Sequence, residues 1–279
     1  MPASVFVLMV SVGMSLRWRE LVANWQRLTW SAWLRLLLAT FIVPPVVALL
    51  LARILPLDLS ETAGLFMVAA APGSPLLTRN LARRGFDMHL AASYQVWGAV
   101  MTPLMIPLLV AGAAKLYGRD IWIPPLAVVV QILEKEFVPL LVGMALAAFL
   151  PVFSRKARAG LNILGNATLT LVFAVLLWKM GPQLRRVTPW VLLAAVLLVA
   201  SSVAAMRLLM SSDRIAVRTL AVSNANRHVG LALLLSGQYI HNRDALPTVA
   251  SYAIVVALLM VLAPKLFRQT GTAAPGAAA

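Results

Sequence analysis

Apolar residues occur in nine blocks, most of them about 20 residues long, separated by short segments that carry charges, proline or glycine. A block of this length matches the hydrocarbon core of a bilayer. Inside hydrocarbon every backbone group must be hydrogen-bonded within the protein, which favours helices. The pattern predicts an all-α integral membrane protein with spans at residues 3–16, 32–55, 62–81, 90–114, 123–150, 161–180, 190–210, 215–236 and 246–267, followed by a flexible tail at 271–279.

The segment of residues 17–30 joins the first two spans and has an amphipathic pattern. Its charged residues lie away from a helical face that carries Trp18, Leu21, Val22, Trp25 and Leu28. A helix of this kind lies on the membrane surface rather than crossing it. We predict simple anchoring for it, and a gating or partner helix is the alternative.

The placement of charge orients the chain in the membrane. The protein is 61% hydrophobic and 12% charged, with a net charge of +15. Segments after odd-numbered spans hold more than twice as many basic residues as the other segments, so they are predicted to be cytoplasmic. The N-terminus is then outside and the C-terminus inside, in a multi-pass protein of the cell (inner) membrane. Basic residues between apolar blocks, without interleaved exposed aromatics, do not indicate nucleic-acid binding.

Two spans contain interruptions that a simple anchor would lack. The third has Pro72 and Pro75 around a Gly-Ser pair, and the eighth has five polar residues within positions 223–228. These spans are five apart and therefore run in opposite directions, as in an inverted repeat, and paired interruptions point to a transporter's binding site. Two independent kinks packed against neighbours are the alternative. The candidate substrate-binding residues are Ser74, Thr78, Asn80, Gln95, Ser223, Asn224, Asn226, Arg227 and His228.

Charged side chains within spans need partners. Arg227 is predicted to bind the substrate anion, while a structural ion pair with Glu134 or Glu136 is the alternative. His228 either carries a proton or serves as a neutral hydrogen-bond partner. A polar run in the fifth span either lines an aqueous cavity or forms a structural cluster, and it consists of Gln131, Glu134, Lys135 and Glu136.

Motifs distributed along the chain resemble those of the bile acid:sodium symporter family. They are VGMSL at 12–16, Pro44, APGS at 71–74, MTPL at 101–104, VPLLVGM at 138–144 and TLAVSNANRHVGLAL at 219–233. The resemblance covers nearly the whole chain and implies the nine-helix form of the family fold. It implies a panel domain at about 1–55 and 123–180 and a core domain at about 62–114 and 190–267. An organic anion would then bind between the domains, near the crossing of the two broken helices.

The positions that correspond to the family's sodium ligands carry different residues here. The resemblance aligns those ligands with Leu77, Thr78, Ala91, Gln95, Ser223 and Arg227. Sodium needs oxygen ligands, and loss of the family's glutamate removes the charge balance. The resemblance therefore implies the family fold, but it does not imply sodium coupling. We hypothesise that Arg227 stands in for sodium in a uniporter, an exchanger or a proton-coupled transporter.

Two other classes of function fit part of the pattern. A membrane sensor would bind an organic anion at the same place without moving it. An intramembrane enzyme would need a metal cluster or a nucleophile and base, but the three histidines, at positions 89, 228 and 241, are dispersed. The chain has no cysteine, which excludes thiolate chemistry and argues against the related arsenite exporters. We predict a non-enzymatic transporter of a small organic anion, embedded in lipid and without a cofactor.

Overall fold

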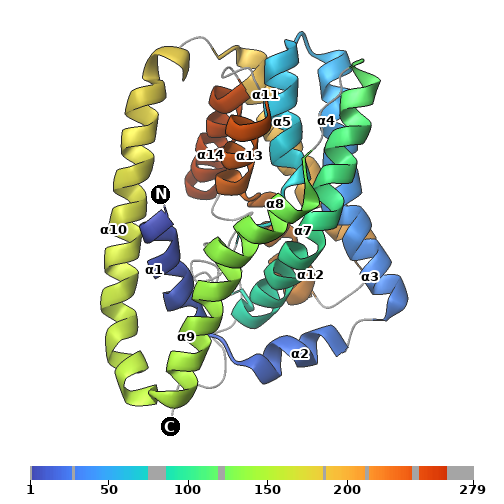
Figure 1. The fold of residues 1–279 in the computed structure, drawn as a ribbon. Helices are drawn as coiled ribbons and strands as arrows, with labels where there is room; N and C mark the ends of the chain where they lie inside the picture. The colour runs from blue at the N-terminus through green and yellow to red at the C-terminus, as the bar shows by residue number, and fades with distance from the viewer. Residues whose placement is uncertain are drawn as a thin grey trace.

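The computed structural model describes residues 2–26, 29–74, 86–118, 123–184, 187–210, 214–240 and 245–262, and most of them lie in helices (Figure 1). The expected all-α fold is confirmed for these residues. In chain order the helices are α1 (Pro2–Gly13), α2 (Trp18–Gln26), α3 (Trp30–Leu37), the π-helical turn η1 (Leu38–Ile42), α4 (Val43–Ile54), α5 (Leu59–Ala70), α7 (Met88–Leu116), α8 (Pro125–Ile132), the π-helical turn η3 (Leu133–Phe137), α9 (Val138–Phe149), α10 (Pro151–Leu184), α11 (Pro189–Leu209), α12 (Arg214–Ala225), α13 (Val229–Tyr239) and α14 (Ala245–Leu262).

Several of these helices have the dimensions and apolar surface of membrane spans. Three described stretches, Trp30–Ile54, Met88–Leu116 and Pro189–Leu209, are long and apolar enough to cross a membrane. Shorter apolar helices occupy further segments. Large apolar side chains point outwards, as with Leu104, which is 60% exposed, and a surface of this kind is suited to lipid. The count of nine spans and the orientation of the termini stay predictions.

In each of the two interrupted spans, a helix ends before it reaches the length needed to cross a membrane. Helix α5 has 12 residues, a rise of about 18 Å, which is a little over half of the hydrocarbon core. It ends at Ala70, just before Pro72, whose missing N–H breaks the helical ladder. The eighth predicted span, 215–236, is two helices rather than one, because α12 ends at Ala225 and α13 begins at Val229.

Helix α10 is longer than the sixth expected span. It begins at Pro151 rather than near residue 161, directly after α9 ends at Phe149. Proline at the start of a helix is compatible with its fixed φ and missing N–H. The basic residues at 155, 156 and 158, expected in a loop, therefore lie on the first turns of α10.

Packing separates the helices into two groups. Helix α1 packs against α9 and α10 along one side of the molecule (Figure 1). Glycine is required at this contact, because a Cβ on Gly13 would meet the carbonyl of Leu140 and one on Gly143 the carbonyl of Val10. Helices α3, η1 and α4 pack instead against α11, and α4 also against α5. The second span thus contacts elements expected in the core, and the division into panel and core domains stays a prediction.

The amphipathic segment folds as α2, which lies across one end of the helices, at the bottom of Figure 1. Trp25 Nε1 donates a hydrogen bond to the carbonyl of Ser93 at 3.0 Å, and Asn24 Nδ2 donates to Ser93 Oγ at 3.1 Å. Leu21 is 1% exposed, whereas Trp18 is 56% exposed. Helix α2 is therefore docked on α7 through one face.

Candidate functional site

The ends of the two broken helices meet and pair through their backbones. The amide of Ser74 donates to the carbonyl of Asn226 at 2.7 Å, and the amide of His228 donates to the carbonyl of Pro72 at 2.7 Å. Gly73 and Arg227 thereby form an isolated antiparallel bridge. Backbone groups freed by a helix break inside a membrane need such partners. The two interruptions therefore form one crossing rather than two independent kinks.

The crossing requires a glycine at position 73. A Cβ on Gly73 would run into the carbonyl of Ser223 and would lie 2.9 Å from the ring of Tyr94. No side chain fits in that space without displacing the backbone of α12. The Gly-Ser pair in the third span therefore allows the second broken helix to approach it closely.

Arg227 is enclosed at the centre of this crossing and is 2% exposed. Its Nη1 donates to Asn224 Oδ1 at 3.0 Å, and its Nη2 donates to the carbonyls of Thr40 at 2.9 Å and Ala69 at 2.8 Å. None of these three acceptors is a carboxylate. The alternative of an ion pair is wrong for Glu134, which is exposed on η3; the side chain of Glu136 lies outside the described residues.

A second set of polar side chains holds these acceptors in place. Tyr94 Oη donates to Asn224 Oδ1 at 2.9 Å and lies 3.1 Å from Thr40 Oγ1. Asn224 Nδ2 donates to the carbonyls of Ala39 at 3.1 Å and Ser202 at 2.9 Å. The sequence interpretation missed Tyr94 and Thr40. Their signal was a polar side chain within an apolar span, which costs free energy unless it finds a partner.

The π-helical turn η1 supplies two of the acceptor carbonyls. Ala39 and Thr40 both lie in this turn, within the otherwise α-helical stretch Trp30–Ile54. A π-turn changes the hydrogen-bond ladder from i→i+4 to i→i+5 and often occurs at functional sites. The irregular turn thus presents carbonyl oxygens to Asn224 and Arg227 from a different helix.

Part of the hydrogen-bonding capacity at the crossing is unused within the described residues. Ser223 Oγ, Asn226 Oδ1 and Arg227 Nε are buried and have no hydrogen-bond partner there. Asn226 Nδ2, in contrast, donates to the carbonyl of Val222 at 2.8 Å. Buried polar atoms without a partner are uncommon in folded proteins, and a bound water or ion is one explanation for them.

His228 acts as the N-cap of α13. Its Nδ1 accepts a hydrogen bond from the amide of Leu231 at 3.1 Å. An imidazole nitrogen that accepts carries no proton, so this contact assigns the proton of the neutral ring to Nε2. Protonation of Nδ1 would turn the acceptor into a donor and remove the cap. The contact favours the neutral hydrogen-bond partner over the proton carrier.

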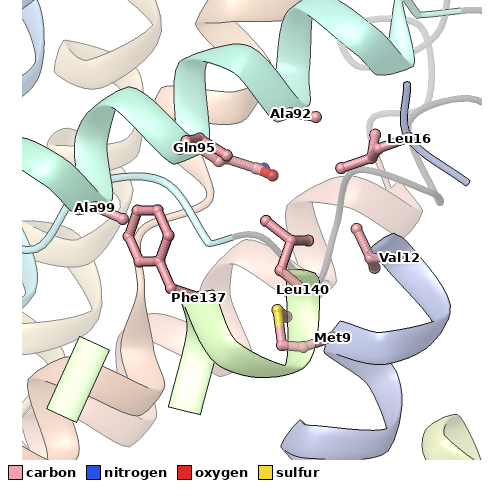
Figure 2. Close-up of a pocket in the computed structure, with 9 residues that line it drawn as sticks. Met9, Val12, Leu16, Ala92, Gln95, Ala99, Phe137 and Leu140 are labelled. Carbon is pink, nitrogen blue, oxygen red and sulfur yellow. The ribbon is translucent and has the colours of Figure 1, made fainter. Parts of the chain in front are cut away.

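A pocket adjoins the crossing through Gln95. Gln95 Nε2 donates to the carbonyl of Ser74 at 2.7 Å, and its amide end points into a pocket between α7, α1 and the η3–α9 segment (Figure 2). The pocket has a cavity volume of about 20 Å³, room for about one water molecule, and is otherwise apolar. Its lining residues are Met9, Val12, Leu16, Ala92, Gln95, Val96, Ala99, Phe137 and Leu140.

The remaining candidates lie elsewhere. Leu77, Thr78 and Asn80 lie outside the described residues. Ala91 is a buried residue of α7 that offers no side-chain oxygen. In the fifth-span run, Gln131 Nε2 donates to Gln238 Oε1 at 2.8 Å, Glu134 is exposed and Lys135 is half-buried. These three side chains are therefore separate from the crossing. Among the described residues, no group of three His, Asp or Glu side chains could hold a metal ion.

Apolar helices of spanning length, packed around two helix ends that meet, fit an integral membrane protein. The chain belongs to the Sodium Bile acid symporter family, whose sequence model matches residues 2–186. The resemblance drawn from the motifs is thereby confirmed. Members of this family are symporters embedded in the membrane, not enzymes. A comparison with curated proteins found no match. The matched range includes the first broken helix and Gln95 but ends before the second broken helix.

Proposed function

We propose that this protein transports a small organic anion across the membrane without sodium, and that Arg227 provides the positive charge that a bound cation would otherwise supply. The observation that carries the proposal is the environment of Arg227. Its guanidinium is enclosed, bonds to three oxygen atoms, and has no carboxylate acceptor among the residues that the structure describes.

The three acceptors are of the type that binds a hard cation. Thr40 and Ala69 offer backbone carbonyls, and Asn224 offers an amide oxygen. Unwound backbone carbonyls and the C-terminal ends of half-helices coordinate sodium in transporters. Ala69 lies in the last turn of α5, where the helix dipole contributes negative partial charge. A guanidinium at this place satisfies the same oxygens while covalently attached, so no ion needs to bind or leave during transport.

The pocket at Gln95 is the binding site that we propose for the anion. It lies where α1 and the η3–α9 segment face α7, beside the crossing of the broken helices. Because its cavity volume is about 20 Å³ here, these helices must move apart for an anion to bind. Alternating access would come from movement of the group of α1, α9 and α10 relative to the remaining helices. Nine spans, an inverted repeat and an outside N-terminus are part of this proposal. Because His228 Nδ1 accepts from α13, we propose that the cycle does not load a proton there.

Uptake into proteoliposomes tests the proposal. The probes are a panel of small carboxylates and the bile salt taurocholate, each supplied with an inward sodium gradient or with an equal potassium gradient. We expect uptake of at least one probe at equal rates in the two salts. Gln95→Ala should weaken binding of that probe, whereas Gln131→Ala, which removes an amide from the separate run, should not.

Each part of the proposal fails on a different result. Uptake that requires sodium would refute the role of Arg227 as the fixed cation. Binding measured by thermal shift, with no uptake in either salt, would refute transport and support a sensor of organic anions. Equal binding by Gln95→Ala and the parent would show that the substrate binds outside this pocket.

A further inference from the structure

A wider groove opens beside the Gln95 pocket, where α1 ends. Its walls come from the connection between α1 and α2, the start of α7 and the face of α9 that includes Met144, Ala145 and Ala148. The groove has a volume of about 870 Å³, which is large enough to admit a whole organic anion. It therefore differs from the narrow pocket, which is enclosed by α1, α7 and α9.

Leu16 separates the groove from the pocket. This residue lines both cavities, and its side chain is 5% exposed. It lies at the end of the connection that follows α1, three residues after Gly13. A molecule that passes from the groove to Gln95 through the wall that the two cavities share would meet the side chain of Leu16.

The chemistry of the groove suits an anion with an apolar body. Arg17 is exposed and His89 is half-buried at the start of α7, and both line the groove. Its opposite wall is formed by small and apolar residues of α9, and no acidic residue lines it among the described part of the chain. A positive charge at the mouth of a cavity raises the local concentration of anions.

We propose that this groove is the vestibule through which an amphipathic organic anion reaches the Gln95 pocket, with Arg17 attracting the anionic group and Leu16 forming the gate. The inference rests on the proposed transport of an organic anion. It adds the route, the residue that selects for negative charge, and the preference for a substrate with an apolar body. By the predicted orientation, the vestibule opens on the cytoplasmic side.

The absence of cysteine from the whole sequence makes a direct test simple. Single cysteines are introduced at Ala148, in the groove wall, and at Ala92, which lines the inner pocket and is 2% exposed. Each is labelled with a negatively charged and with a positively charged methanethiosulfonate reagent of similar size. Neither measurement requires a known substrate or any transport.

The charge test concerns Arg17. A unit charge in the wall of the groove changes the labelling rates of the two reagents in opposite directions. We therefore expect Arg17→Gln to lower the ratio of negative to positive reagent at Ala148→Cys several-fold at low ionic strength. Arg19→Gln is the matched control, because Arg19 is exposed nearby on α2 but does not line the groove. An equal effect of both variants, or no effect of Arg17→Gln, would refute the proposal that the groove is the vestibule for an anion.

The gate test concerns Leu16. We expect Leu16→Ala to accelerate labelling at Ala92→Cys at least tenfold while labelling at Ala148→Cys stays unchanged, which also verifies that the fold is intact. If Leu16→Ala does not fold, Leu16→Val provides the same comparison with a smaller expected gain. No acceleration in the folded variant would refute the gate.

Protection experiments distinguish the proposal from its rivals. Taurocholate should slow labelling at Ala148→Cys in the parent. Protection by phosphatidylglycerol but not by taurocholate would identify a lipid groove and overturn the inference. If the labelling pattern holds but no organic anion is taken up by proteoliposomes, the vestibule stands and the proposed transport function fails.

Discussion

Replacement of Arg227 by glutamine tests whether this buried arginine takes the place of a bound cation or only stabilises the fold. Glutamine is too short to reach all three acceptors of the guanidinium, so the carbonyls of Thr40 and Ala69 would lose their donor. Each buried acceptor without a donor costs about 1–3 kcal/mol. The shorter side chain also leaves a space of about 30 Å³, roughly the share of one water molecule, which offsets part of that cost. We expect the variant to lose about 2–4 kcal/mol of unfolding free energy in potassium chloride.

Sodium should recover much of this loss if Arg227 stands in for a cation. The vacated space is lined by two carbonyls and the amide oxygen of Asn224, and a sodium ion restores the charge that the substitution removed. A ligand present at about 100 times its Kd stabilises a protein by about 2.7 kcal/mol. At 100 mM sodium and a Kd near 1 mM, the variant should therefore approach the stability of the parent.

The assay is thermal unfolding of the detergent-purified protein, followed by tryptophan fluorescence, with sodium chloride titrated against potassium chloride at constant ionic strength. Arg218→Gln is the matched control, because Arg218 is an exposed arginine on α12 that is not at the crossing. The parent and the control should respond equally to both salts. A parent that is stabilised by sodium, or an Arg227→Gln variant that responds equally to both salts, would refute the reasoning.

Three further substitutions test the geometry of the crossing. Gly73→Ala should destabilise the protein by about 1–3 kcal/mol, because its Cβ meets the carbonyl of Ser223. Gly112→Ala is the control and should be neutral or stabilising, because a Cβ there has no neighbour within 4 Å. Thermal unfolding compares the two variants, and equal unfolding temperatures would contradict the close approach at Gly73. His228→Ala should cost about 1 kcal/mol through loss of the α13 cap, and faster amide exchange confined to the first turn of α13 would locate the effect. Tyr94→Phe should cost about 0.6 kcal/mol, a typical interhelical hydrogen bond in a membrane, and a loss above about 2 kcal/mol would show that the hydroxyl has a larger role.

The sequence alone determined the class of the protein and the position of its irregular segments. Apolar blocks of spanning length imply helices because hydrocarbon leaves the backbone no other partner. The proline at position 72 and the polar run at 223–228 predicted where two helices break, and α5, α12 and α13 end or begin within a few residues of those positions. These are local properties, since a missing N–H or a buried polar side chain acts on its own turn of helix.

Only the tertiary structure decided which groups meet at the break. Arg227 bonds to carbonyls that lie 187 and 158 residues away in the sequence, in η1 and in the last turn of α5. A carboxylate partner was the natural sequence-based alternative, but backbone carbonyls carry no signature in the sequence because every residue has one. They become available only where a π-turn and a helix end are packed against the second broken helix. The partners of the buried charge therefore follow from how three distant segments pack, and not from any of them alone.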